Sequence, residues 1–199
     1  MNRIGVCLIG CGRIAATHIR AAYENREALQ MAAVCDLIPS KMEDVLEASA
    51  FSGRESAAIR RYIDYREMLE VEKPGVVAVA TESGSHAAIA LDAIQSGCHV
   101  IVEKPVALST LDADRLIAAA KEKGVLLSAC HQNRFNAAVR LLRGAIEAGR
   151  FGRLLYGAVS VRWNRGPEYY RQAGWRGTWA QDGGALMNQC IHAIDLLGW

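Results

Sequence analysis

The sequence lacks the cysteine spacing that marks disulfide-rich and zinc-binding proteins. Its 199 residues include six cysteines, but none of them forms a C-x-x-C pair, and most stand among apolar residues. The sequence therefore favours reduced thiols packed in a core over disulfides or metal ligands, and we expect no metal site. The six positions are Cys7, Cys11, Cys35, Cys98, Cys130 and Cys190.

An excess of charge of one sign and long apolar runs are also missing. The formal net charge is only +2, and no basic run stands out, which argues against a nucleic-acid partner. No apolar stretch approaches the length of a membrane span, and Met1-Asn2-Arg3 leads into a strand pattern rather than a signal peptide. We therefore expect a cytoplasmic protein without a membrane partner. The sequence shows neither an internal repeat nor a low-complexity linker.

A glycine-rich turn organises the first half of the chain. The apolar run 4–9 predicts a buried strand, the run 15–22 predicts a helix, and the turn between them has the spacing G-x-G-x-x-A. In a dinucleotide-binding turn, Gly10 permits the tight bend, Gly12 lets the backbone approach a pyrophosphate, and small Ala15 lets the helix pack closely. The helix N-terminus offers N–H groups and about half a positive charge to phosphates. Taken alone, the same spacing also occurs in plain turns.

An acidic residue follows the second predicted strand, residues 30–35. Asp36 stands about twenty residues past the glycines, where a dinucleotide fold places the carboxylate that accepts from the adenosine ribose hydroxyls. A carboxylate about 4 Å from a 2′-phosphate would oppose it by about 4 kcal/mol at an effective dielectric near 20, so NAD is favoured over NADP. Lys41 is close enough in sequence to soften that repulsion. The alternative for Asp36 is a cap or turn residue before Pro39.

Predicted strands and helices alternate with short loops as far as residue 130. This order defines an α/β fold, a doubly wound parallel sheet of the Rossmann type. We assign residues 1–130 to a dinucleotide-binding domain and 131–199 to the truncated start of an α+β substrate domain. The further predicted strands are 61–63, 76–80, 99–102 and 125–129, and the further predicted helices are 39–50, 65–71, 87–95 and 110–123.

The composition changes after the helix predicted over residues 137–148. Residues 154–163 predict a long strand, and an aromatic, arginine-rich loop follows from 163 to 179. Such a loop suits a sugar or nucleotide surface, through stacking and forked hydrogen-bond donors, and an ordinary covering loop is an equal alternative. Its rings belong to Trp163, Tyr169, Tyr170, Trp175 and Trp179.

The last predicted helix, residues 183–197, carries two stripes. Five apolar residues follow the i, i+3, i+4, i+7 spacing of a buried face: Met187, Cys190, Ile191, Ile194 and Leu197. Asn188, His192 and Asp195 form a polar stripe beside them. A lone helical histidine is usually structural, but one aligned with an amide and an acid after a double glycine is a candidate for acid–base chemistry.

Together these motifs resemble the Gfo/Idh/MocA family, that is, glucose–fructose oxidoreductase and inositol dehydrogenase. In the family's order, the resemblance is carried by residues 10–15, 81–86, 97–105 and 183–195. The segments 131–135, 175–179 and 188–189 look most like the branch that oxidises UDP-N-acetyl-glucosaminuronic acid at C3. The resemblance implies an NAD-dependent oxidoreductase that moves a hydride from a ring carbinol of a sugar or nucleotide sugar to the nicotinamide.

The resemblance also implies catalytic roles. Lys104 would touch the reacting hydroxyl and help to relay its proton, and His192 would be the general acid/base; the alternative for Lys104 is a solvated surface lysine. Asn188 stands where many members carry Asp, and an amide can hydrogen-bond a hydroxyl but cannot take its proton. A cis peptide is expected between Lys104 and Pro105.

The cofactor implied by the resemblance is NAD, with Glu103 holding the ribose on the nicotinamide side. We expect the cofactor-binding residues to be Gly10, Gly12, Arg13, Ile14, Asp36, Lys41, Thr81, Ser83, His86, Glu103, Lys104, Trp175 and Arg176. Family members continue into a broad sheet, so we expect this chain to be a fragment of a longer enzyme that is a homo-oligomer. The alternatives are a cyclitol or free-sugar dehydrogenase, and a non-catalytic dinucleotide-binding sensor.

Overall fold

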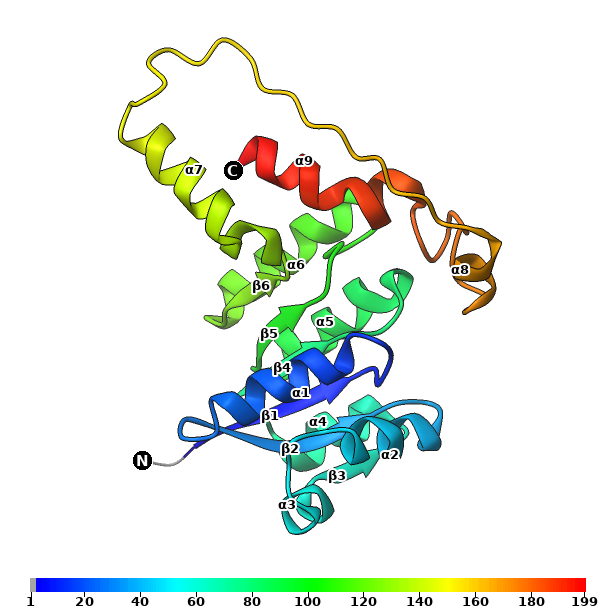
Figure 1. Ribbon diagram of the computed structural model, residues 1–199. Coiled ribbons are helices and arrows are strands. Elements are labelled where there is room, and N and C mark those ends of the chain that lie inside the picture. Colours follow the sequence, from blue (N-terminus) through cyan, green and yellow to red (C-terminus); the bar gives the residue numbers. More distant parts are fainter. Residues whose placement is uncertain (1–2) are drawn as a thin grey trace. The chain divides into compact units, whose positions relative to one another are not determined.

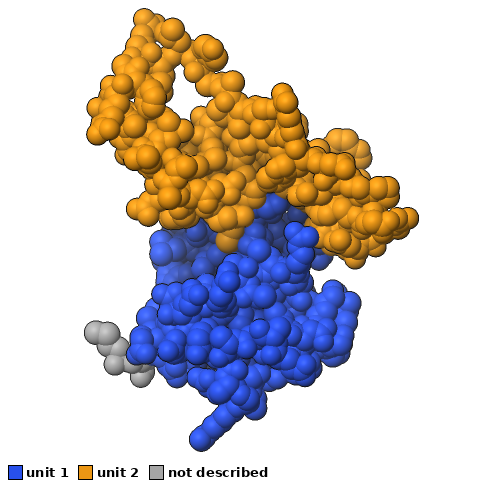
Figure 2. Space-filling model, in the orientation of Figure 1, with its two compact units in different colours: residues 1–129 blue, residues 130–199 orange. Residues whose placement is uncertain are grey.

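A computed structural model describes residues 3–199 (Figure 1). The chain separates into two compact units, Met1–Ala129 and Cys130–Trp199 (Figure 2). Across the described residues, no helix has both the length and the apolar character needed to cross a membrane.

The first unit is built on a six-stranded sheet in the order β3-β2-β1-β4-β5-β6, and all five neighbouring pairs are parallel. The sequence prediction of a doubly wound parallel sheet is therefore confirmed. The strands are β1 (Ile4–Ile9), β2 (Leu29–Cys35), β3 (Arg60–Tyr62), β4 (Val76–Val79), β5 (His99–Val102) and β6 (Leu127–Ala129). The helical segments are α1 (Ala15–Glu24), α2 (Pro39–Glu47), α3 (Gly53–Ala58), α4 (Tyr65–Glu72), η1 (Ser83–Ser85), α5 (His86–Gln95) and α6 (Thr110–Lys123).

Both faces of this sheet are buried, because the strands alternate side chains between two apolar cores. Within β1, Cys7 and Ile9 join a core with residues of α4, α5 and α6, whereas Val6 and Leu8 join a second core with α1 and α2. Continuous apolar strands such as 76–80 are typical of sheets covered on both sides. The first unit therefore positions its loops on a rigid, close-packed support.

The cysteines lie where the sequence analysis expected them. None of the six forms a disulfide within the described residues, and Cys7, Cys11, Cys35 and Cys98 are buried. Burial, with smaller effects of nearby carboxylates, raises the pKa of Cys7, Cys11 and Cys35 to about 12. Because the thiolate is the reactive form, these side chains are inert packing groups at neutral pH.

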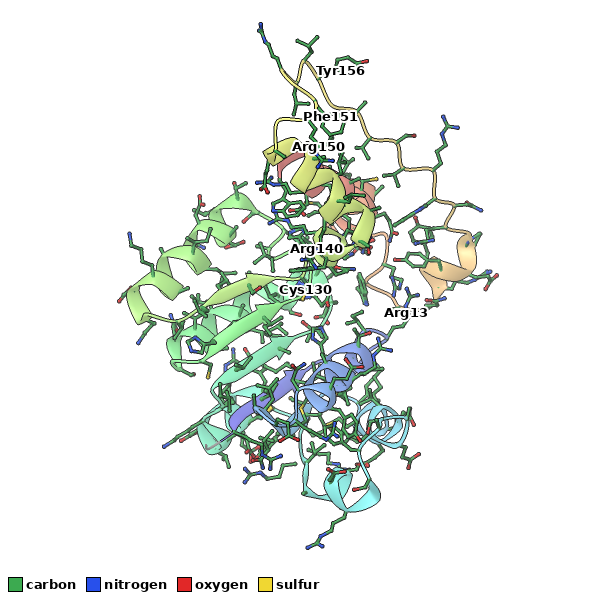
Figure 3. All side chains as sticks on the ribbon, turned by 60° about the vertical axis from the view of Figure 1, so that its left-hand side comes forward. Arg13, Cys130, Arg140, Arg150, Phe151 and Tyr156 are labelled. Atoms are coloured by element: carbon green, nitrogen blue, oxygen red, sulfur yellow. The ribbon has the colours of Figure 1, made fainter. Side chains whose placement is uncertain are left out.

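The second unit is helical, and here one sequence prediction is wrong. Its elements are η2 (Gln132–Phe135), α7 (Ala137–Glu147), α8 (Pro167–Arg171), the π-helix η3 (Leu186–Cys190) and α9 (Ile191–Gly198). The strand predicted over 154–163 does not form, and Tyr156 is 88% exposed on this segment (Figure 3). An apolar pattern favours an extended chain, but a strand also needs a neighbouring strand to take up its backbone hydrogen bonds. The described part of this unit contains no such strand.

The last helix also differs from its prediction at its N-terminal end. Gly183 and Gly184 have φ of +74° and +81°, a left-handed conformation that does not belong in a right-handed helix. After them the chain forms η3 and only then α9. A π-turn widens the helix, and such turns are frequent at functional sites.

The tightest point of the first unit lies where β1 ends. Gly10 has φ of +94°, and a Cβ built on it would lie 2.6 Å from the carbonyl carbon and oxygen of Ala80 and 2.7 Å from the nitrogen of Thr81. These are backbone atoms of the chain leaving β4, so they cannot rotate away. The first glycine of the turn is therefore required both by its φ and by this close approach.

We predict that Gly10→Ala lowers the free energy of unfolding by about 2 kcal/mol or more, since it combines left-handed strain with overpacking against backbone. Denaturant unfolding of the purified protein measures the change. Gly53→Ala is the matched control, because a Cβ there meets nothing within 4 Å and its φ is not left-handed. Equal stability of the Gly10 and Gly53 variants would contradict the prediction.

Candidate functional site

The loops that follow β1, β2, β4 and β5 emerge from one edge of the parallel sheet. β1 pairs with β2 on one side and with β4 on the other, so the order in which the strands are added reverses between β1 and β4. This switch point is the position where open α/β sheets bind ligands. Backbone hydrogen bonds hold these loops together: Gly10 donates to Cys35 (2.8 Å), Ala80 to Ile9 (2.7 Å) and Glu103 to Val79 (2.9 Å). This edge contains most of the residues predicted to bind the cofactor.

The glycine turn and the start of α1 suit a pyrophosphate. A Cβ added to Gly12 would meet nothing within 4 Å, so the backbone is open to a ligand. No side chain caps the N-terminus of α1, and its first turn has no acidic residue, whereas in α6 the Ser109 side chain accepts from the backbone N–H of Asp112. The positive end of α1 is thus left for an outside anion. Arg13 and Ile14 are exposed beside it, and Figure 3 shows the Arg13 side chain extending from the turn.

The Asp36 carboxylate lies directly beside this turn. Its Oδ2 accepts a hydrogen bond from the backbone N–H of Cys11 (2.8 Å), and its Oδ1 accepts one from Ile38 (2.9 Å). Asp36 is thus a turn residue and a neighbour of the glycine turn at once, so the two interpretations of the sequence are compatible. An ionised carboxylate has about four acceptor positions, which leaves some for ribose hydroxyls. Lys41 is exposed in α2, and no ion pair joins it to Asp36 within residues 3–199.

The loop after β4 is braced from inside. His86 is 1% exposed, with Nδ1 2.8 Å from the carbonyl oxygen of Pro105 and Nε2 3.1 Å from that of Thr81. The hydroxyl of Ser85 donates to Thr81 Oγ1 (3.0 Å), and Ser83 is buried. His86 therefore ties the loop after β4 to the loop after β5, and the cofactor contacts predicted for Thr81, Ser83 and His86 remain predictions.

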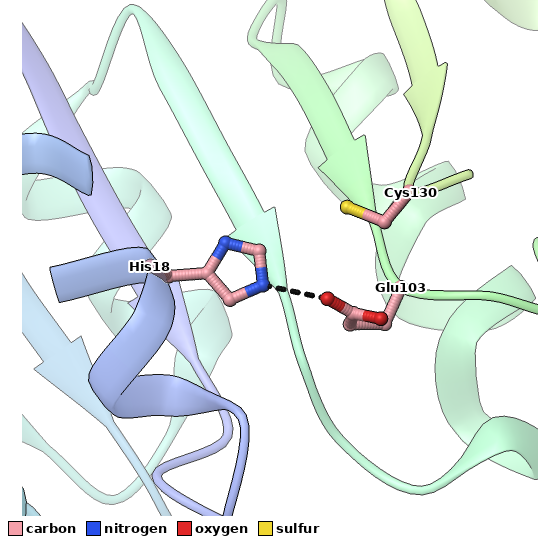
Figure 4. A group of neighbouring side chains, drawn as sticks. All are labelled: His18, Glu103 and Cys130. Atoms are coloured by element: carbon pink, nitrogen blue, oxygen red, sulfur yellow. Dashed lines mark hydrogen bonds and ion pairs between the residues drawn. The ribbon is translucent and has the colours of Figure 1, made fainter. Parts of the chain in front are cut away.

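The loop after β5 carries the residues with the most specific expected roles. The peptide between Lys104 and Pro105 is cis, as expected, and the Lys104 side chain is partly buried. Glu103 Oε1 lies 2.9 Å from His18 Nε2, and each side chain is 14% exposed (Figure 4). His18 was missed by the sequence analysis. The available signal was its position three residues after Ala15, which places it on the sheet-facing side of α1.

In the second unit, the final helix buries its polar stripe. Asn188 and His192 are each 8% exposed and the side chain of Asp195 is 9% exposed, whereas Ile194 and Leu197 are about half exposed. Burial of polar groups costs free energy unless they are hydrogen-bonded, so such a stripe points to a built site rather than to packing. In this helix, the polar stripe is therefore more buried than the apolar stripe.

Asp195 anchors this helix to η2. Arg134 Nε donates to Asp195 Oδ2 (2.8 Å) and Nη2 donates to Oδ1 (2.5 Å), and His131 Nδ1 lies 3.5 Å from Oδ2. Burial alone would raise the pKa of Asp195, but the hydrogen bonds from Arg134 and the charges nearby hold it below its ordinary value. The rings of His131 and His192 meet edge to face, with centroids 6.4 Å apart. Asp195 is therefore a structural carboxylate that stays ionised.

The aromatic loop and η3 enclose a pocket of about 510 Å³. Arg176 Nη1 donates to the Tyr169 hydroxyl (2.5 Å), and its guanidinium lies over the rings of Tyr169 and Trp175, 4.3 and 4.7 Å from their centroids. The lining residues are Tyr169, Tyr170, Arg176, Gly177, Asp182, Gly184, Ala185, Asn188 and Gln189. Part of the loop thus builds a pocket lined by aromatic and polar side chains, while Trp163 and Trp179 are exposed. Cofactor contacts of Trp175 and Arg176 remain predictions.

Two family models match the chain. The model described as "Oxidoreductase family, NAD-binding Rossmann fold" matches residues 4–131, and the model described as "GFO/IDH/MocA C-terminal domain" matches residues 139–199. The chain belongs to the Gfo/Idh/MocA oxidoreductase family. Its first unit carries the family's NAD-binding Rossmann fold, as the glycine turn and Asp36 indicated.

The relatives are dehydrogenases and reductases. The 1,5-anhydro-D-fructose reductase of Ensifer adhaerens is 31% identical over 99% of this chain and 56% of its own length. The WlbA dehydrogenase of Bordetella pertussis, solved with NADH and UDP-GlcNAcA, is 38% identical with a TM-score of 0.91, over 100% of this chain and 58% of its own. The WlbA enzyme of Chromobacterium violaceum, solved with the same two ligands, is 36% identical with a TM-score of 0.91, over 100% and 55%. The chain spans about half the length of the curated relatives it matches.

We predict that Asp36→Asn weakens NAD binding, because the amide leaves one acceptor oxygen in place of two. It should also lower the ratio of NAD affinity to NADP affinity by about 10-fold, because it removes a charge that opposes a 2′-phosphate. Dissociation constants for both dinucleotides, measured by calorimetry, give the ratio. Asp44→Asn, at an exposed position of α2, is the matched control. An unchanged ratio in a folded Asp36 variant would rule out this role.

We predict a pH-dependent effect for Arg134→Gln. Since the native pKa of Asp195 lies below its unfolded value, the pair stabilises the fold above about pH 4 and loses its effect as pH falls through the native pKa. The variant should therefore unfold more easily than wild type at pH 7, and the difference should be smaller at pH 3. Denaturant midpoints at the two pH values test this, with exposed Arg140→Gln as the control. The same loss at both pH values would contradict it.

Proposed function

We propose that the protein is an NAD-dependent dehydrogenase of a nucleotide sugar that carries a carboxylate, of the UDP-GlcNAcA type. The observation that carries the proposal is the likeness to two dehydrogenases solved with NADH and UDP-GlcNAcA, which extends over all of this chain at 36–38% identity. That likeness includes the second unit, where substrate-binding residues are expected, and is not limited to the widespread Rossmann fold.

In this proposal, the first unit binds the dinucleotide through groups that its fold holds ready. Gly12 and the uncapped end of α1 receive the pyrophosphate, Asp36 accepts from the adenosine ribose, and Glu103 accepts from the second ribose. The His18 contact holds Glu103 in one orientation, so little rotamer entropy is lost on binding. Bound NAD supplies a nicotinamide carbon that accepts a hydride from the sugar.

Lys104 and His192 handle the proton that the sugar hydroxyl loses in the same step. A neutral amine or imidazole takes it, which leaves a carbonyl on the sugar. His192 is suited to this task because its buried helix position fixes the ring, and Lys104 because it is partly buried and stands two residues after the end of β5. Asn188 cannot take a proton, so in this proposal it only binds and orients the hydroxyl.

One cation in the pocket of the second unit supports an acidic sugar, since the Asp182 carboxylate in the same pocket already accepts from Gly177 and Asn188. The Arg176 guanidinium lines this pocket together with the Tyr169 hydroxyl and the amides of Asn188 and Gln189. A planar cation with forked donors matches a carboxylate better than a neutral hydroxymethyl group. A neutral free sugar or cyclitol is the second candidate, favoured by the relative named for 1,5-anhydro-D-fructose.

We predict that UDP-GlcNAcA supports NAD reduction, and that Lys104→Met and His192→Asn each lower kcat by about 100-fold or more through loss of proton transfer. Absorbance at the NADH band, over a panel of UDP-sugars, free sugars and inositols, measures the activity. Lys121→Met, at an exposed position of α6, is the control and should leave kcat unchanged.

Several outcomes would redirect the proposal. Turnover of neutral sugars alone would favour the free-sugar or cyclitol alternative. Full activity in both the Lys104 and His192 variants would rule out the proton-handling roles. Tight NAD binding without oxidation of any sugar would favour a dinucleotide-binding sensor.

A further inference from the structure

The Tyr169 hydroxyl is the meeting point of several hydrogen bonds around the pocket of the second unit. Arg176 Nη1 donates to its oxygen (2.5 Å), and the side-chain nitrogen Nε2 of Gln189 lies 2.9 Å from the same oxygen. A guanidinium can only donate, so the direction of the contact with Arg176 is fixed. The direction of the contact with Gln189 depends on which way the Gln189 amide faces.

Arg165 decides the orientation of the Gln189 amide. Arg165 Nη2 donates to Gln189 Oε1 (3.0 Å), so the carbonyl end of the amide faces Arg165 and the NH₂ end faces Tyr169. If the amide were reversed, its NH₂ group would oppose the guanidinium, and neither group can accept a hydrogen bond. The Tyr169 oxygen therefore accepts two hydrogen bonds, one from Arg176 and one from Gln189.

The proton of the Tyr169 hydroxyl has a poor acceptor within the described part of the chain. That acceptor is Asn188 Oδ1, 3.5 Å away, whereas O–H···O hydrogen bonds usually end at about 3.0 Å. The same Asn188 oxygen already accepts from Gln189 Nε2 at 2.6 Å. A ligand oxygen at an ordinary hydrogen-bond distance would therefore take this proton in preference to Asn188.

Arg176 is a second donor group of this pocket with unused N–H groups. Its Nε is buried and has no hydrogen-bond partner among residues 3–199, and the ion pairs found there do not include Arg176. The side-chain carboxylate and amide oxygens that line the pocket, by contrast, have protein donors. Asn188 Oδ1 accepts from Gln189, and the two Asp182 oxygens accept from Gly177 and Asn188. These side chains thus offer a ligand donors rather than acceptors.

We infer that Tyr169 is a specificity-determining residue, whose hydroxyl donates to the carboxylate of an acidic sugar beside Arg176. The inference rests on the proposed function, in which the substrate carries such a carboxylate. An ionised carboxylate only accepts, so it takes the Tyr169 proton and the free N–H groups of Arg176 and needs no acceptor in return. A hydroxymethyl group in the same place brings a proton of its own, and the carboxylate and amide oxygens of the pocket already have donors.

The test compares two nucleotide sugars that differ at the group in question. UDP-GlcNAcA carries the carboxylate, and UDP-GlcNAc carries a hydroxymethyl group in its place. Tyr169→Phe removes the hydroxyl and keeps the ring that the Arg176 guanidinium contacts. Tyr156→Phe is the matched control, because it removes the same hydroxyl from a side chain that is 88% exposed. Denaturant midpoints show whether each variant is folded.

We predict that the wild-type protein saturated with NADH binds UDP-GlcNAcA about 10-fold or more tightly than UDP-GlcNAc. Tyr169→Phe should weaken the binding of UDP-GlcNAcA by about 10-fold or more and that of UDP-GlcNAc by much less, because hydrogen bonds to charged groups are the stronger ones. Tyr156→Phe should change neither dissociation constant. Calorimetric titration of each protein with each nucleotide sugar measures the constants.

The outcomes separate this inference from the proposed function, because binding to the NADH complex involves no turnover. Equal affinity of the wild-type protein for the two nucleotide sugars overturns the inference, whether or not the variant folds. A folded Tyr169→Phe protein that keeps its affinity for UDP-GlcNAcA, or loses affinity equally for both ligands, overturns it as well. If the predicted binding pattern is found but no sugar is oxidised, the dehydrogenase function fails and the donor role of Tyr169 stands. Binding of neither nucleotide sugar overturns both.

Discussion

The close approach of two strand ends controls the architecture of the first unit. The backbone leaving β4 passes so near to Gly10 that a single methyl group does not fit. This contact places the glycine turn after β1 beside the Thr81 loop, and the hydrogen bond from Ala80 to Ile9 keeps both in register. A ligand site at this edge is thus a consequence of strand packing, and the loops need only supply the appropriate side chains.

The distribution of helix caps supports the same conclusion from the electrostatic side. The sequence caps α3, α4 and α6 with the side chains of Ser52, Asp64 and Ser109, but it gives no side-chain cap to α2, α5 or α7. It leaves α1 uncapped and without an acid in its first turn. An uncapped start exposes backbone donors that a bound anion can satisfy. Because α2, α5 and α7 are uncapped as well, the missing cap points to an anion site only together with the glycine turn that precedes α1.

What could be predicted from the sequence depended on whether the deciding interactions are local. The strand patterns of the first unit and the glycine turn involve neighbours in sequence, and both appear in the structure. The strand expected over 154–163 failed because pairing depends on a partner that no local pattern reveals. His18 and Asp182 escaped notice for a related reason. His18 meets Glu103 across 85 residues, and the partners of Asp182 are a loop N–H and an amide whose orientation no spacing rule gives.

Asn188 shows how a change of residue type can preserve the hydrogen bonds of a position while it removes the acid–base function. An aspartate at that position would bring a second negative charge against Asp182, and two carboxylates so close cannot both ionise without a large rise in one pKa. An amide removes the conflict, because it donates to Asp182 with one end and accepts with the other. The loss is the ability to take a proton, which places that task on Lys104 and His192 in the proposed reaction. Whether a family member carries an acid or an amide here should therefore vary with the residue six positions earlier, since the two side chains share a single hydrogen bond.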